Sequence, residues 1–344
     1  MFFSTAPHLL RTATARLTQT TAHVKPRMHS RMAHNSTATL NTGVKIPLLG
    51  FGTWQDKEAQ EPAVTIALKS GYRHIDTARI YGTEAAVGNA IRNSGVPRNQ
   101  IFLTTKLWNN KHDPKDVAVA LDASLHDLQT DYVDLYLMHW PVAFEPSNEN
   151  FPKDSHGKTK TADIDYVATY KAMEKTLDSG KAKAIGISNF SQSELERLLK
   201  ETTIVPAAHQ MEMHPWLQQK SFAEFHKQKG IHVTHYSPFG NQNEVYDAGK
   251  GISKLMDEPV LVDIGKKHGK TGAQVALAWG IAKGHSVIPK SKTESRIKQN
   301  LEGDFQLDSE DLERIAGLDK KLRFNDASKS FGYNFFIDLD GKKK

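Results

Sequence analysis

The chain has 344 residues, of which 38% are hydrophobic and 24% charged, and its net charge at pH 7 is +6. It contains no cysteine, which excludes disulfides, thiolate nucleophiles and cysteine-ligated zinc or iron–sulfur clusters. No metal site is expected. No membrane partner is expected either, because the chain has no run of ~18 apolar residues. Positive and negative residues are interspersed from Lys106 onward, without a basic stripe among aromatics, so no nucleic-acid partner is expected.

Residues 1–37 differ in composition from the rest of the chain. Residues 1–55 contain no Asp or Glu, and the first 37 are rich in Arg, Ser and Thr. This composition is typical of a mitochondrial transit peptide. A disordered tail, or a start placed too early with Met28 or Met32 as the true first residue, explains it equally well. We expect an N-terminal extension over 1–37, one domain over 38–344, and a cytoplasmic location, or a mitochondrial one if the extension is a transit peptide.

Strand-like and helical segments alternate from Leu40 onward. The expected strands are Ile46–Gly50, His74–Thr77, Ile101–Leu107, Tyr132–His139, Lys183–Ser188, Ala207–Met211, His232–Tyr236 and Ser286–Ile288. The helical patterns between and after them include Asp113–Leu128, Tyr166–Leu177, Ser191–Leu199, Gln274–Ala282 and Ser309–Leu318. The third of these begins with a predicted capping box of Ser191 and Glu194. Strands that alternate with helices of this length predict βαβ units and a parallel sheet.

Eight strand candidates over roughly 250 residues predict an α/β fold, a (β/α)8 TIM barrel with a disordered N-terminal extension. The alternative, a doubly wound sheet, needs a glycine-rich turn after its first strand. The only candidate turn, Gly50 to Trp54, lacks the third glycine, and no helical pattern follows it directly. The barrel is therefore the preferred architecture.

Four polar residues fall at or just after the ends of the expected strands. They are Asp76, Tyr81, Lys106 and His139. In a TIM barrel the active site is built at the carboxyl ends of the strands, so the four should meet. A lysine ammonium held by an aspartate would lower the pKa of the tyrosine phenol, and the phenol could then protonate a carbonyl oxygen. Each residue alone is more often a structural hydrogen-bonding group, and His139 could be a core histidine; their joint position argues for chemistry.

Further residues suit a substrate and a cofactor. Trp54, Trp108, Trp140 and Phe144 could form an apolar wall, although they could equally plug the barrel mouth. Ser188, Asn189 and Gln210 could bind a carboxamide, and the ring of Tyr236 could stack on an aromatic cofactor. The run from Lys290 to Arg296 suits a phosphate at a helix entrance, but alone it is better explained as a solvated charged turn.

The motifs together resemble a known family. They are GFGTW (50–54), GYRHIDTARIYGTEAAVG (71–88), YVDLYLMHWP (132–141), GISNF (186–190), HQMEMHP (209–215), YSPFG (236–240) and IPKSKTESRIKQN (288–300). In this order they resemble the aldo-keto reductases over nearly all of residues 38–340. The resemblance implies NADPH as the cofactor, a small-molecule carbonyl substrate and a monomer.

The resemblance also implies roles for individual residues. Asp76, Tyr81, Lys106 and His139 would be the catalytic tetrad, with Tyr81 the general acid. The cofactor would be bound by Thr53, Trp54, Asp76, Ser188, Asn189, Gln210, Tyr236, Ser237, Phe239, Lys290, Ser291, Thr293, Arg296, Gln299 and Asn300. The substrate would contact Trp54, Tyr81, Trp108, His139, Trp140 and Phe144.

Within the family, segment 235–249 and the loop after Trp140 look most similar to fungal glycerol dehydrogenases and glyceraldehyde reductases. This implies NADPH-dependent reduction of short hydroxyaldehydes such as glyceraldehyde, with oxidation of polyols such as glycerol as the reverse reaction. A pentose reductase of the xylose type and a general aldehyde reductase are alternatives. An NADPH-sensing regulatory subunit on the same fold is a third.

Overall fold

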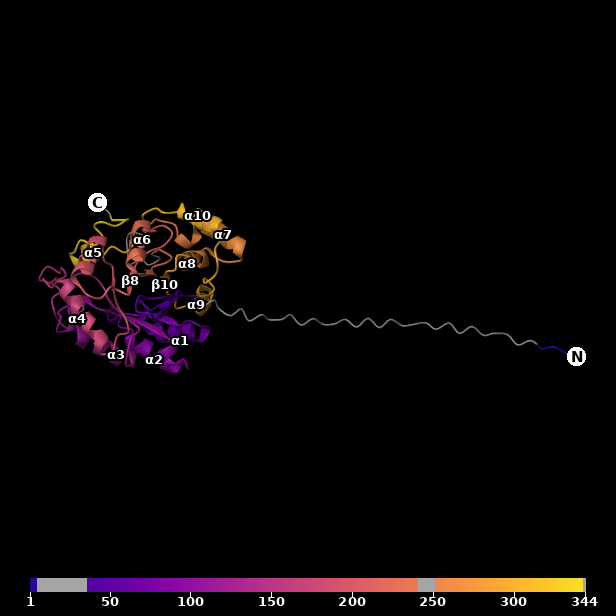
Figure 1. The fold of residues 1–344 in the computed structure, drawn as a ribbon, viewed down its shortest axis with the longest axis horizontal. Coiled ribbons are helices and arrows are strands. Elements are labelled where there is room, and N and C mark those ends of the chain that lie inside the picture. Colours follow the sequence, from indigo (N-terminus) through magenta and orange to yellow (C-terminus); the bar gives the residue numbers. More distant parts are fainter. Residues whose placement is uncertain (5–35, 241–250, 343–344) are drawn as a thin grey trace. The chain divides into compact units, whose positions relative to one another are not determined.

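The computed structural model describes residues 1–4, 36–240 and 251–342. The chain divides into two units, Met1–Met32 and Ala33–Lys344 (Figure 1). Residues 1–4 form neither helix nor strand. The expected N-terminal extension therefore lies mostly outside the described residues, and the domain boundary after residue 37 stays a prediction.

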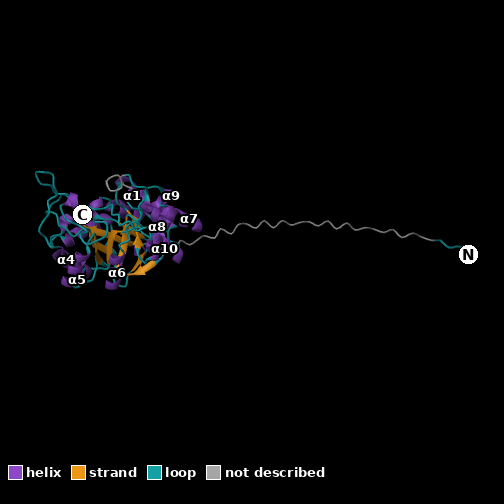
Figure 2. Ribbon diagram, turned by 90° about the horizontal axis from the view of Figure 1, so that it is seen from above, coloured by secondary structure: helices purple, strands orange, loops and turns teal. Residues whose placement is uncertain are grey.

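Eight parallel strands occupy the centre of the second unit, with helices around them (Figure 2). They are β3 (Phe51–Gly52), β4 (His74–Asp76), β5 (Phe102–Leu107), β6 (Leu135–Met138), β7 (Ile185–Ser188), β8 (Ala208–Glu212), β9 (His232–Tyr236) and β10 (Ser286–Val287). Each strand pairs with the next in sequence. The ends of the sheet meet where Leu49 bridges Val287 and the Gly52 amide donates to the Pro289 carbonyl at 3.0 Å. The predicted (β/α)8 fold is confirmed.

At least one helix follows each barrel strand, as predicted, with two between β9 and β10 and three after β10. They are α1 (Gln60–Ser70), α2 (Glu84–Asn93), α3 (Val117–Leu128), α4 (Tyr166–Asp178), α5 (Gln192–Glu201), α6 (Lys220–Lys229), α7 (Pro259–His268), α8 (Gly272–Ala282), α9 (Glu294–Leu301), α10 (Ser309–Ala316) and α11 (Ser328–Phe331). The capping box at the start of α5 is confirmed, because Ser191 and Glu194 each bond the other's backbone amide. A continuous apolar core joins the strands to the inner faces of these helices.

The expected strand Ile46–Gly50 is wrong, because a hairpin strand ends within this segment and the first barrel strand begins just after it. Residues Lys45–Pro47 form β2, which pairs antiparallel with β1 (Thr37–Thr39), and the first barrel strand is β3. Pro47 has no amide hydrogen to extend the hairpin ladder, and Ile46 is buried against residues near the starts of β5 to β8. The hairpin therefore covers the amino-terminal end of the barrel and leaves the carboxyl end to the site.

Two other features complete the fold. A helix, α1, follows β3 after residues 53–59, although the sequence showed no helical pattern directly after GFGTW. Residues 57–59 form a short 3-10 helix (η1) that joins the two. Within the described ranges, none of the helices is long and apolar enough to cross a bilayer.

Candidate active site

The ends of β4, β5 and β6 bring the expected tetrad together. Asp76 is the last residue of β4, Lys106 is the penultimate residue of β5, and His139 directly follows β6. Tyr81 ends a short 3-10 helix, η2 (Arg79–Tyr81), just after β4. The turn closes on Gly82, whose φ of 63° is left-handed, a conformation that glycine adopts without strain.

Lys106 is the centre of the cluster. Its Nζ atom lies 2.6 Å from Asp76 Oδ1, 2.9 Å from the carbonyl oxygen of Thr77 and 3.4 Å from the phenol oxygen of Tyr81. These three acceptors match the three hydrogens of an ammonium group. Because the lysine donates to the phenol oxygen, the phenol's own hydrogen is directed elsewhere and is available to another acceptor.

The ring of His139 also packs against Tyr81. The two ring centres are 5.8 Å apart in an edge-to-face arrangement, and the Trp108 ring lies 5.2 Å from His139. Within the described structure, His139 Nδ1 is buried without a hydrogen-bond partner. This is not the fully satisfied core histidine that the sequence left open as an alternative.

Burial controls the protonation of the cluster. Burial, and then the charge of Lys106, hold the pKa of His139 well below its ordinary value, so this ring is neutral at pH 7. Burial also lowers the pKa of Lys106, while Asp76 opposes that shift.

The direction expected for Tyr81 is wrong for this state of the site. Burial raises the pKa of Tyr81 well above its ordinary value, and the Asp76 carboxylate raises it further. The Lys106 ammonium does not offset this, because it lies 2.6 Å from Asp76 but 3.4 Å from the phenol. Tyr81 therefore holds its proton at neutral pH, as a general acid must before it reacts.

Residues from β6 to β9 form a second hydrogen-bonded group beside the tetrad. The Gln210 side-chain amide donates to Asp76 Oδ2 at 2.6 Å. The Asn189 amide donates to the His139 carbonyl at 3.0 Å and to Ser188 Oγ at 3.1 Å, and its oxygen accepts the Tyr236 hydroxyl at 2.7 Å. The three residues expected at a carboxamide, and the tyrosine expected to stack on the cofactor ring, thus lie together and connect directly to the catalytic cluster.

The remaining residues expected to bind the cofactor near the strand ends are placed as follows. Thr53 is buried, and its amide and hydroxyl both donate to the Asp76 carbonyl at 3.0 Å. Ser237 has a left-handed φ of 48°, and its hydroxyl accepts from Asn325 at 3.3 Å. Phe239 packs against the main core, and Trp54 is partly exposed. All four lie at the carboxyl end of the barrel.

The expected phosphate segment follows β10 and leads into α9. Lys290 and Lys292 both form ion pairs with Asp56, and Ser291 Oγ accepts from the Thr293 amide at 3.1 Å. Arg296 is exposed in the first half of α9. Two residues of α9 complete the set: Gln299, exposed, whose carbonyl accepts from Gln274 at 2.8 Å, and Asn300, which is buried.

Asp56 is the residue of this region that sequence reasoning missed. It belongs to the loop after β3, and both Gln55 and Asp56 have left-handed φ values, 68° and 53°. The signal was present, because Asp56 is the first acidic residue of the chain, only two positions after the GFGTW motif. Its partners lie 234 and 236 positions away, a pairing that no local pattern reveals.

Three of the four expected aromatic residues form one cluster with the C-terminal tail. Trp108, Trp140 and Phe144 pack with Phe331, Phe335 and Phe336. The tail is anchored by buried Glu212 at the end of β8, whose two oxygens accept the amides of Phe324 and Asn325 at 2.8 Å each. Trp54 lies outside this cluster.

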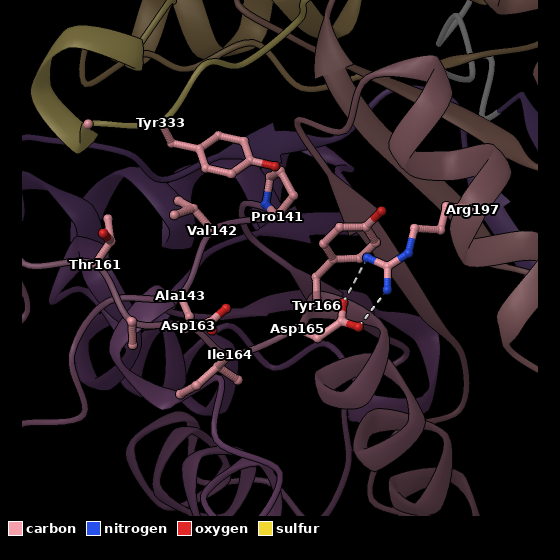
Figure 3. A pocket seen from close by; sticks show the side chains of 12 residues that line it. Pro141, Val142, Ala143, Thr161, Asp163, Ile164, Asp165, Tyr166, Arg197 and Tyr333 are labelled. Carbon is pink, nitrogen blue, oxygen red and sulfur yellow. Dashed lines mark hydrogen bonds and ion pairs between the residues drawn. The ribbon is translucent and has the colours of Figure 1, made fainter.

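A separate pocket is lined in part by the loop that follows His139 (Figure 3). Its volume is about 410 Å³, and it is lined by Pro141, Val142, Ala143, residues 161–166, Arg197, Gly332 and Tyr333. Arg197 is held there by both oxygens of Asp165, at 2.6 and 3.0 Å. The tetrad residues do not line it, so this pocket is distinct from the candidate active site.

Within the described part of the chain, one group of side chains has metal-ligand spacing. Ligand atoms of His268, Asp308 and Asp311 lie within 4.8 Å of one another. Lys267 Nζ, however, bonds Asp308 at 2.5 Å and Asp311 at 3.0 Å. These contacts join α7 to α10 and give the carboxylates a structural role.

Known proteins are similar to the chain over most of its length. The pattern of the Aldo/keto reductase family matches residues 48–320. An uncharacterised oxidoreductase of Schizosaccharomyces pombe is 48% identical over 299 residues, which is 86% of this chain and 92% of the relative. Aldo-keto reductase family 1 member A1 of Xenopus tropicalis is 43% identical over 293 residues, covering 83% and 89%.

A solved structure agrees with these relatives. The aldose reductase of Schistosoma japonicum is 33% identical and superposes with a TM-score of 0.81, covering 88% of this chain and 99% of that one. The matched residues include the strands that carry the tetrad and the segment that follows β10. The chain is an oxidoreductase and belongs to the aldo-keto reductase family.

Proposed function

We propose that the protein reduces short hydroxyaldehydes such as glyceraldehyde with NADPH, and oxidises polyols such as glycerol in reverse. The observation that carries this proposal is the position of Lys106, whose ammonium bonds Asp76 and the phenol of Tyr81 at the carboxyl end of the barrel. The names of two similar proteins, an aldose reductase and an aldo-keto reductase, support carbonyl reduction as the reaction.

The donor set fits the cofactor. A nicotinamide nucleotide needs a flat surface, amide partners for its carboxamide and cations for its phosphates. The Tyr236 hydroxyl donates to the Asn189 side chain at 2.7 Å, and Ser188 and Gln210 lie beside Asn189. Lys290, Lys292 and Arg296 at the entrance to α9 provide three positive charges, which favours a 2′-phosphate and hence NADPH over NADH.

In the proposed mechanism, bound NADPH supplies a hydride to the carbonyl carbon. The residues of the chain then protonate and orient the carbonyl oxygen, which becomes strongly basic as the carbon is reduced. Tyr81 donates its phenol hydrogen to that oxygen, and Lys106 stabilises the phenolate that remains. Neutral His139 lies beside Tyr81 and can donate a second hydrogen bond that orients the oxygen. Asp76 keeps the lysine charged and in place.

The aromatic cluster of Trp108, Trp140 and Phe144 supports a carbonyl substrate, because it excludes water from the oxygen that receives the proton. The preference for glyceraldehyde rests on the loop after Trp140 and on segment 235–249. Residues 241–249 of that segment lie outside the described residues.

The test is steady-state oxidation of NADPH by the full chain with glyceraldehyde, xylose, glucuronate and an aromatic aldehyde, repeated with NADH. Glyceraldehyde should lead by about tenfold in kcat/KM, roughly 1.4 kcal/mol of discrimination. Tyr81→Phe should lose about 10²- to 10⁴-fold in rate while NADPH binding, measured by calorimetry, is unchanged. Full activity in Tyr81→Phe would contradict the proton-donor assignment, and tight NADPH binding without turnover would favour a sensing subunit.

A further inference from the structure

Asp56 connects two distant segments at the place where the cofactor's phosphate is proposed to bind. Its carboxylate contacts Nζ of Lys290 and lies 3.1 Å from Nζ of Lys292. These two ammonium groups lower the pKa of Asp56, so the carboxylate is ionised at neutral pH. A carboxylate between two lysines has the shape and charge of part of a phosphate group.

The backbone holds Asp56 in this position at a conformational cost. Gln55 and Asp56 are consecutive non-glycine residues with left-handed φ values of 68° and 53°. Such residues persist only where their surroundings impose the conformation. Here the buried Gln60 side chain donates to the Gln55 carbonyl at 2.5 Å, and the Ala59 amide donates to the Asp56 carbonyl at 2.9 Å. The loop is therefore built to direct this carboxylate toward the lysines.

We propose that Asp56 competes with the cofactor's 2′-phosphate for Lys290 and Lys292, and so sets the affinity and the release rate of the cofactor. The proposal rests on the phosphate site of the proposed function. Lys290, Lys292 and Arg296 carry three positive charges, and Asp56 reduces their sum from +3 to +2. A phosphate must displace the carboxylate or bind beside it, and either event weakens its binding.

The same competition assists cofactor exchange. As the phosphate leaves, the carboxylate can return to the two ammonium groups, so neither is left without a counter-charge. The contact of Asp56 with Lys292 is largely exposed, which lets the pair exchange partners. Release of products, of which the oxidised cofactor is one, often limits the turnover of an enzyme, so a carboxylate at this position favours turnover at the expense of affinity.

The test compares Asp56→Asn with the wild-type full chain. Asparagine tolerates the left-handed conformation, so the loop should keep its shape. Glu58→Gln is the matched control, because Glu58 is exposed in η1 and makes no ion pair among the described residues. The probes are adenosine 2′-monophosphate and adenosine 5′-monophosphate, titrated by calorimetry at low and high salt. Circular dichroism checks that each variant is folded.

Asp56→Asn should bind adenosine 2′-monophosphate about fivefold more tightly at low salt, the equivalent of ~1 kcal/mol. The gain should shrink at high salt, while binding of the 5′-isomer and of both probes by Glu58→Gln is unchanged. Stopped-flow release of NADP⁺ should be slower in Asp56→Asn by a similar factor.

An unchanged or weaker affinity of Asp56→Asn would overturn the competition; weaker binding would mean that Asp56 holds the lysines in position. If the wild-type chain does not distinguish the 2′- from the 5′-isomer, the phosphate site itself is wrong, and the proposed cofactor fails with it. If the wild type distinguishes them and Asp56→Asn does not differ from it, only the competition fails.

Discussion

Buried and partly buried histidines should make the stability of the protein fall steeply below pH 6.5. Burial lowers the pKa of His74 and His226 to about 4, and that of His112, His232 and His285 to about 3. An unfolded histidine titrates near 6.5. The unfolded chain therefore binds more protons than the folded chain as pH falls through 6.5, so stability is fully present above this pH and is lost below it.

The size of the effect follows from these pKa values. At pH 5, a histidine with a pKa of 6.5 in the unfolded chain and about 3 to 4 in the folded one lowers the free energy of unfolding by ~2 kcal/mol. Five such residues together cost up to ~10 kcal/mol, which is comparable with the ~5–15 kcal/mol that stabilises a typical protein. Buried Glu84 and partly buried Asp134 act in the opposite direction, because desolvation raises the pKa of each carboxyl.

The assay is urea unfolding at pH 7, 6 and 5, followed by circular dichroism. The midpoint should fall with pH while the slope of the transition stays constant. His112→Leu isolates one site, since both ring nitrogens of His112 are buried without a hydrogen-bond partner in the described structure. Whatever the variant loses at pH 7, its stability should fall by ~2 kcal/mol less between pH 7 and pH 5 than that of the wild type. Parallel profiles for the two proteins would refute the reasoning.

Two further predictions concern single contacts. Lys106→Met leaves the buried Asp76 carboxylate without its cation, and should cost ~3–5 kcal/mol of stability as well as activity. Adding Asp76→Asn should restore most of the stability. A double variant as unstable as Lys106→Met would contradict this account. Gly186→Ala places a Cβ atom 2.3 Å from the Ala208 carbonyl oxygen between β7 and β8, so thermal unfolding should show a loss of at least ~3 kcal/mol, whereas a wild-type melting temperature would mean that the strands separate easily.

The tetrad could be predicted because it depends on the direction of parallel strands. Asp76, Lys106 and His139 each lie at or within one residue of the end of a buried strand, and parallel strands all end at the same rim. The direction of the strands alone was enough to place these three residues together. The same logic placed Ser188, the last residue of β7, beside Gln210 of the neighbouring strand β8, because the two residues are paired in register.

Other features could not be predicted because they depend on backbone conformation or on distant packing. The segment Ile46–Gly50 reads as one apolar strand, yet it is divided between a hairpin and the barrel by contacts with other strands. The ion pairs of Asp56 require two consecutive left-handed residues, and although aspartate adopts that conformation more readily than most residues, glutamine at position 55 gives no sign of it. Charged residues in loops were therefore the least predictable part of the site.

The raised pKa of Tyr81 is consistent with its proposed role as an acid. A general acid must hold its proton until the substrate oxygen becomes basic, and a carbonyl oxygen becomes an alkoxide, a much stronger base than a phenolate, as the hydride arrives. Lys106 already donates a hydrogen bond to the phenol oxygen at 3.4 Å. When the phenol gives up its proton, that contact becomes an ion pair in a buried site, where it is strongest. The lysine thus stabilises the tyrosine mainly after proton transfer, which is the state that catalysis requires.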